Sequence, residues 1–135
     1  MPVVTLARAE AILDAALAEA ARHDLAVSAA VVDAGGHLVA FRRMDGAEIA
    51  GPALAVDKAY TAIALSGSTA DLAAEAQPGG ALFGIQSTGG GRFVVFGGGV
   101  PVRDGDLIVG GVGVSGAPDP AVDDACARAG AAAFG

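Results

Sequence analysis

The chain has 135 residues, 53% of them hydrophobic, and a net charge of −7. This length fits one domain, residues 1–135, because domains commonly have about 100–150 residues. The eight Lys and Arg residues are scattered, which argues against a nucleic-acid partner, and no apolar run approaches the roughly 20 residues of a membrane helix. No secretion signal is recognisable at the start, so we expect a cytoplasmic protein.

The first half of the chain predicts a helix, a hairpin and two more helices. Residues 5–23 carry apolar side chains at helical spacing behind a capping threonine. Two β-type runs, VSAAVVD and HLVAFRR, follow and are joined at residues 34–36 by a Gly-Gly turn, which indicates an antiparallel hairpin. Helical composition returns at residues 53–65, and a shorter helix over residues 69–76 follows a capping serine or threonine.

The second half predicts a three-stranded meander and a final helix. The strands are residues 93–96, 100–103 and 107–115, with an Asp-Gly turn between the last two. Asp119 and Pro120 begin a helix that runs to about residue 134. All five predicted strands have close sequence neighbours and are apolar on both faces. We therefore predict the α/β (α+β) class: an α-β-α sandwich with a five-stranded, mostly antiparallel sheet.

A literal GxGxxG pattern, made by Gly111, Gly113 and Gly116, invites a nucleotide-binding interpretation. A dinucleotide-binding unit needs a second parallel strand after the helix and an acidic residue about 20 positions on, and this chain supplies neither. We expect close packing of a strand on a helix instead. Two histidines and one cysteine, Cys126, do not make a zinc site, and the cysteine is expected to be buried and inert.

Charged residues inside apolar stretches are the most informative candidates. They are Asp33, Arg42, Arg43, Lys58 and Arg92. Burying an unpaired charge costs several kcal/mol, so each of them must be paired, exposed or directed into a solvated pocket. Ion pairs, mostly with Asp45, Asp57 and Asp71, are the alternative to a functional site.

The two histidines have different predicted settings. His23 lies at the end of the first helix, where the helix dipole favours a cation. His37 follows the Gly-Gly turn, so it is expected to be exposed or at a pocket rim. For both, a solvated role stands beside metal or haem ligation.

Four segments of the chain are similar to one known family. They are SAAVVDAGGHLVAFRRMDGA, DKAYTA, AQPGGALFGIQSTGGGRFVVFGGGVPV and IVGGVGVSG. In this order they resemble the GlcG/HbpS family, which includes the C-terminal domain of PduO-type corrinoid adenosyltransferases. The resemblance implies a profilin-like fold, assembly into homo-oligomers from tetramers to octamers, and haem binding in some members. The entry to the last helix, Gly116–Pro120, departs from the family pattern, so contacts made there by relatives are in doubt.

Two functions follow as expectations. In the first, the chain is a small-molecule-binding protein with haem or another tetrapyrrole as its ligand. Its pocket lies between the hairpin, the helix carrying Lys58 and the glycines Gly97, Gly98 and Gly99. Arginines such as Arg43 and Arg92 would hold the propionates, and His23 or His37 would be the metal ligand.

In the second, the same pocket is the site of a small acid–base enzyme, an isomerase or lyase acting on an organic acid. Arg43 or Arg92 would bind the carboxylate, and Asp33, His37 or Lys58 would move the proton. The sequence leaves both functions open, because neither the distances between these groups nor their pKa values can be read from it.

Overall fold

Four helices, four strands and two single-turn 3-10 helices make up the computed structural model, which describes residues 3–135. In chain order the helices and strands are α1 (Leu6–Arg22), β1 (Ser28–Asp33), β2 (Leu38–Arg43), α2 (Gly51–Ala64), α3 (Thr69–Glu75), β3 (Gly99–Asp104), β4 (Leu107–Ser115) and α4 (Pro120–Ala132). The 3-10 helices are Ile85–Ser87 and Gly89–Gly91.

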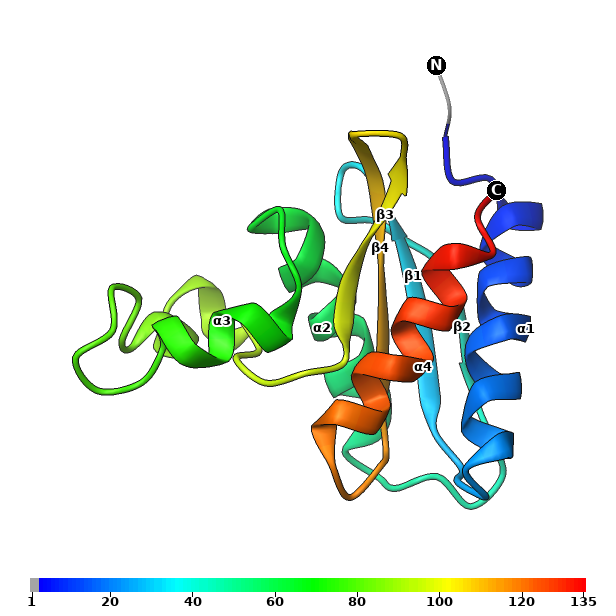
Figure 1. Cartoon of the computed structure of the whole chain (residues 1–135), viewed down its shortest axis with the longest axis horizontal. Helices are drawn as coiled ribbons and strands as arrows, with labels where there is room; N and C mark the ends of the chain where they lie inside the picture. The colour runs from blue at the N-terminus through cyan, green and yellow to red at the C-terminus, as the bar shows by residue number, and fades with distance from the viewer. Residues whose placement is uncertain (1–2) are drawn as a thin grey trace.

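The sheet has the order β2-β1-β4-β3, and every neighbouring pair is antiparallel. Helices α1 and α4 lie side by side on one face and α2 covers the other, as Figure 1 shows. The largest core cluster is built from small and β-branched side chains between the sheet and the α1–α4 layer. The predicted α-β-α sandwich is therefore confirmed.

Local capping interactions explain where three of the helices begin. Thr5 accepts a hydrogen bond from the Arg8 amide (3.2 Å), and Ser68 accepts one from the Asp71 amide (3.2 Å). Asp119 begins α4 by accepting from the Ala121 amide at 2.9 Å. Side-chain oxygens at these positions bind amides that lack a partner within the helix. The predicted starts of α1, α3 and α4 are confirmed.

The prediction of a fifth strand at residues 93–96 is wrong. In the part of the chain that the structure describes, the sheet has four strands, and Phe93–Phe96 is not one of them. The amide of Val94 donates instead to the hydroxyl of Thr61 in α2, at 3.0 Å. The apolar FVVF composition predicts burial in an extended form, but a helix side chain satisfies this amide in place of a neighbouring strand.

Close packing of β4 on α2 explains two glycines of the GxGxxG pattern. A Cβ atom at Gly111 would collide with the carbonyl oxygen of Ala59, and one at Gly113 would collide with that of Ala55. Both carbonyls belong to α2. The helix therefore lies directly on the strand backbone, and the predicted strand-on-helix packing is confirmed at these positions.

Beyond α3 the chain projects from the body of the molecule (Figure 1). We call residues 76–98 the arm. The arm contains both 3-10 helices and returns to the body at the start of β3. Thr69 holds this return, because its hydroxyl accepts a hydrogen bond from the amide of Gly99 at 2.9 Å.

Candidate functional site

Lys58 is completely buried where α2, β4 and the start of α4 meet. Its Nζ donates to the carbonyl oxygen of Val114 at 3.0 Å and to Oδ2 of Asp123 at 3.3 Å. The ring of Phe96, at the base of the arm, lies with its centroid 4.8 Å from the same Nζ. The ammonium group is thus enclosed by a carboxylate, a carbonyl and an aromatic face.

Burial acts against both charges of the Lys58–Asp123 pair. Desolvation lowers the pKa of Lys58, and attraction to Asp123 opposes this change. Desolvation also raises the pKa of Asp123, although the amide of Ala117 donates to its Oδ1 at 3.0 Å and stabilises the carboxylate. Asp123 therefore ties the entry of α4 to Lys58.

The glycines Gly97, Gly98 and Gly99 pack against this ion pair. A Cβ at Gly98 would lie 2.6 Å from Nζ of Lys58, and one at Gly97 would lie 2.8 Å from the carbonyl oxygen of Pro120. All three glycines are buried. The structure therefore brings Lys58 and the glycine run together as predicted, but it fills the space between them with backbone.

Asp123 is a site residue that the sequence analysis did not select. Its place in the first turn of a helix gave it an ordinary explanation, because acidic residues are favoured there. It lies 65 positions from Lys58 in the chain. The two side chains come together only because α2 and α4 pack across one end of the sheet. No pattern of neighbouring residues in the sequence predicts this contact.

Asp33 and His37 lie in the turn between β1 and β2. Oδ1 of Asp33 accepts hydrogen bonds from the amides of Gly35 and His37, each at 3.0 Å. This arrangement is typical of aspartates that stabilise tight turns. His37 itself is exposed, as the sequence predicts.

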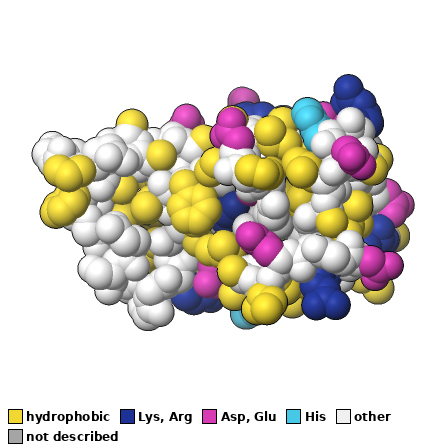
Figure 2. All heavy atoms as spheres, turned by 90° about the horizontal axis from the view of Figure 1, so that it is seen from below, with side chains coloured by type: hydrophobic (Ala, Val, Ile, Leu, Met, Phe, Trp, Pro, Cys, Tyr) yellow, Lys and Arg dark blue, Asp and Glu magenta, His cyan; other side chains and the backbone are white. Residues whose placement is uncertain are grey.

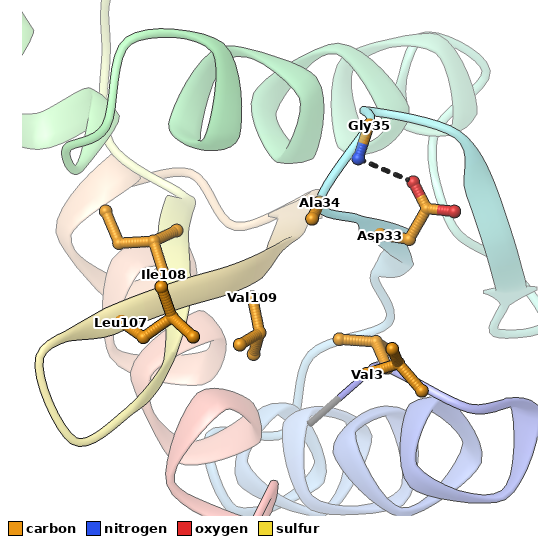
Figure 3. Close-up of a pocket in the computed structure, with 8 residues that line it drawn as sticks. Val3, Asp33, Ala34, Gly35, Leu107, Ile108 and Val109 are labelled. Carbon is orange, nitrogen blue, oxygen red and sulfur yellow. Dashed lines mark hydrogen bonds between the residues drawn. The ribbon is translucent and has the colours of Figure 1, made fainter. Parts of the chain in front are cut away.

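A cavity of about 270 Å³ opens beside this turn, as Figure 3 shows. Its walls come from the N-terminal segment, the β1–β2 turn and the start of β4, namely Val3, Val4, Asp33, Ala34, Gly35, Leu107, Ile108 and Val109. The side chains are mostly aliphatic, and in Figure 3 the Asp33 carboxylate points toward the Gly35 amide. Pockets for drug-sized ligands have about 300–1,000 Å³, so this cavity suits only a small apolar group.

Arg92, at the arm, is part of a cluster on the surface of α2. Its Nε donates to Oδ1 of Asp57 at 3.1 Å, which confirms one of the predicted ion-pair partners. The guanidinium also stacks on Tyr60, 3.7 Å from the ring centroid, and Tyr60 in turn stacks on Phe93. Gly36 lies against the Tyr60 ring, so the cluster adjoins the turn that carries His37.

The β2 strand extends this surface. Arg43 pairs in register with Ser28, whose hydroxyl lies against Gly51 of α2, so Arg43 is on the α2 side of the sheet. Phe41, two residues earlier and 37% exposed, shares that side. We call this surface the α2–β2 face and define it by Phe41, Arg43, Tyr60 and Arg92. It combines apolar area with two guanidinium groups, and it is bordered by the β1–β2 turn, in which the His37 ring lies beside Gly35 and Asp33.

His23 is separate from this face. It is exposed at the end of α1, in the layer on the opposite side of the sheet, and its Nε2 lies 3.1 Å from Oε2 of Glu19. Arg42, another candidate charge, also belongs to the α1 side, where it binds Glu10 and Asp14. The predicted site residues therefore do not converge on one point.

Three further observations limit the chemistry of the described residues. Among residues 3–135, no group of three His, Cys, Asp or Glu side chains is placed to share a metal ion. Burial raises the pKa of Cys126 to about 11, so the thiol is protonated at neutral pH. None of the helices in the described part of the chain has the length and apolar character to span a membrane.

The fold and its surface define the chain as a small domain of the antiparallel α-β-α sandwich class. The family model described as "Haem degrading protein HbpS-like" matches residues 4–132. The chain therefore belongs to the HbpS-like family.

Two relatives from Citrobacter freundii differ in how much of their own length the match covers. An uncharacterised 15.0 kDa protein from the dhaT-dhaS intergenic region is 40% identical over 113 residues, which is 84% of this chain and 80% of that protein. The corrinoid adenosyltransferase PduO is 38% identical over 102 residues, which is 76% of this chain but only 30% of the transferase.

Solved structures agree closely with the fold. Klebsiella pneumoniae protein ORFY has a TM-score of 0.94 and 34% identity, with 99% of this chain and 92% of that chain covered. PduOC, solved as a complex with haem, has a TM-score of 0.92 and 32% identity, with 98% and 95% covered. HbpS has a TM-score of 0.90 and 32% identity, with 100% and 92% covered.

Proposed function

We propose that this protein binds haem or a related tetrapyrrole on the α2–β2 face and acts as a homo-oligomer. The observation that carries the proposal is an accessible face with apolar area and two arginines, bordered by the turn that carries the exposed His37. The similarity to PduOC, solved with haem bound, supports the ligand class. A tetrapyrrole would need more space than the cavity of Figure 3 offers, so a surface that a second subunit can cover suits it better.

Each element of the face has a separate role in this proposal. His37 would bind the haem iron, because its imidazole is exposed and makes no ion pair, whereas His23 is engaged with Glu19. Phe41 would contact the porphyrin plane, and Tyr60 would extend that apolar area. Arg43, which has no ion-pair partner among residues 3–135, and Arg92 bind the propionates. When bound, haem would supply the iron chemistry, and the residues of this face would hold the haem in place.

The first test is a haemin titration of the purified chain, followed by its Soret band. The wild type is expected to give a shifted, saturable band, His37→Ala is expected to lose it, and His23→Ala is the matched control that retains it. No saturable binding by the wild type overturns the proposal. Loss in His23→Ala with retention in His37→Ala would assign the axial ligand to α1 instead.

The arginines offer a second, quantitative test. Arg43→Gln is expected to raise the dissociation constant for haemin by about tenfold or more, because a hydrogen bond to a charged group contributes about 1.5–3 kcal/mol. Arg103→Gln removes the same charge from an exposed position on β3, away from the α2–β2 face, and is the control. Equal weakening by both variants would show only a general charge effect and would remove the propionate role.

The alternative, an acid–base enzyme for an organic acid, stays a prediction. Its candidate groups are dispersed, since Lys58 is enclosed by Asp123 and Val114 while Asp33 is bonded within its turn. If turnover of such an acid is found, Lys58→Met is the test, because it keeps the length of the side chain without its amine. An unchanged rate would eliminate Lys58 as the proton carrier.

A further inference from the structure

Arg103 and Asp71 are charged side chains without an ion-pair partner among residues 3–135. Charged side chains of both signs are spread over the body of the molecule, as Figure 2 shows for one face. Most arginines of the chain bind a carboxylate, namely Arg22, Arg42, Arg92 and Arg128. Arg103 is an exception, and its surroundings indicate what it could bind instead.

Arg103 and Asp71 both line one cavity of about 430 Å³ at the β3 edge of the sheet. The walls of this cavity are the turn between α2 and α3, the first turn of α3, β3 and the last turns of α4. Arg128 of α4 adds a second guanidinium group. Its Nε donates to Oδ2 of Asp124 at 2.7 Å, which holds the group in place and leaves its other N–H groups for a ligand.

The backbone is irregular on both sides of this cavity. The register between β3 and β4 shifts between Val102 and Arg103, and such bulges increase the twist of a strand and redirect its side chains. On the other side, Ser66 follows the last residues of α2 with a φ of 55°, a conformation in which glycine is favoured. The serine carries strain that glycine would avoid, which points to a role for its hydroxyl at the cavity wall.

The charges in the cavity select the class of ligand. A simple anion would meet the Asp71 carboxylate and the repulsion of a chain with net charge −7, and a simple cation would meet two guanidinium groups. A molecule with both a carboxylate and an ammonium group matches both signs. Pro101, also in the wall, has no backbone N–H, so this edge is poorly suited to adding a peptide strand. A small zwitterion therefore fits better than an extended peptide.

We propose that this cavity binds a small zwitterion of the amino-acid type. Arg103 and Arg128 hold its carboxylate and Asp71 holds its ammonium group, through charge-assisted hydrogen bonds. The hydroxyl of Ser66 adds a neutral hydrogen bond. β3 and β2 form opposite edges of the sheet, so this site is separate from the α2–β2 face, and the inference is independent of haem binding.

The test is an NMR titration of the full-length protein without haemin, followed by the amide signals of Gly67 and Arg103. The probes are glycine, β-alanine, γ-aminobutyrate and ε-aminocaproate, which differ in the distance between ammonium and carboxylate. At least one of them is expected to shift these signals saturably. Butyrate and n-butylamine match γ-aminobutyrate but carry one charged group each. They are expected to bind at least about tenfold more weakly, because each lacks a hydrogen bond between charged groups.

Variants of the cavity wall test each contact with the best probe. Arg103→Gln and Asp71→Asn are each expected to weaken binding by about tenfold or more. Arg22→Gln and Asp45→Asn remove the same charges from exposed positions outside the cavity, and these controls are expected to bind like the wild type. Ser66→Gly is expected to weaken binding about threefold while raising the midpoint of urea unfolding, because glycine relieves the left-handed strain. Weaker binding by a more stable variant does not come from misfolding.

Three results would overturn the proposal. The first is that none of the four zwitterions binds saturably. The second is that butyrate or n-butylamine binds as tightly as the best zwitterion, which would make this a site for a single charge. The third is equal weakening by the cavity variants and by Arg22→Gln and Asp45→Asn, which would show only a general charge effect.

Discussion

The body and the arm are both rich in glycine but use it in opposite ways. In the body, Gly111 and Gly113 let α2 lie on β4. In the arm, Gly84 and Gly90 have positive φ angles and nothing within 4 Å of a would-be Cβ. Glycine provides close approach at these two positions of the body and turns at these two positions of the arm. We therefore expect Gly111 and Gly113 to be more sensitive to added volume than Gly84 and Gly90.

The largest expected effect comes from the buried ion pair in the body. Lys58→Ala should lower the free energy of unfolding by about 3–5 kcal/mol, because it leaves the Asp123 carboxylate buried without its partner. Urea unfolding measures this change. The double variant Lys58→Met with Asp123→Leu should recover most of the loss, since it removes both charges and restores apolar volume. A single variant as stable as the wild type would contradict the structural role of the pair.

A smaller effect separates the two kinds of glycine. Gly113→Ala should cost about 3 kcal/mol, because the added methyl collides with the Ala55 carbonyl in a packed layer. Gly90→Ala, in the open space of the arm, should cost only about 1 kcal/mol, the strain of a left-handed conformation. Urea unfolding of both variants provides the comparison. Equal losses would mean that the packing of α2 on β4 is not tight.

Local signals predicted most of the body. Capping residues located the starts of α1, α3 and α4, and the Gly-Gly and Asp-Gly turns located both hairpins. The continuous apolar run at residues 107–115 predicted the observed bounds of β4, Leu107–Ser115. These features depend on neighbours within a few residues, which is why one sequence is enough to find them.

Long-range contacts were not predictable in the same way. Phe93–Phe96 has strand composition, but Thr61 of α2 takes the amide that a fifth strand would have bonded. Lys58 was selected as a buried charge, yet its partner Asp123 was not, because the contact depends on how two helices meet beyond the sheet. The sequence likewise gave candidate site residues without showing that His37 and His23 lie in different layers.

The smallest expected effect concerns pH. Because burial raises the pKa of Asp123, the folded protein binds a proton at this carboxyl more readily than the unfolded chain does. This contribution to stability is fully present below the unfolded value of 3.8 and is lost as pH rises through the folded-state pKa. Lys58→Met should raise the folded-state pKa of Asp123 further, because the variant lacks the ammonium group whose attraction lowers this pKa. The contribution to stability should then persist to higher pH. Carboxyl NMR titration of both proteins measures the shift, and an unchanged titration would contradict the contact.

The most direct test of the account is to locate haemin on the folded protein by NMR. Paramagnetic iron broadens the amide signals of residues near it. We predict broadening of Phe41 and Tyr60 on the α2–β2 face and of Gly36 and His37 in the adjoining turn, with the signals around His23 at the end of α1 unaffected. Broadening centred on His23, or none at saturating haemin, would contradict the assignment of the ligand to the α2–β2 face.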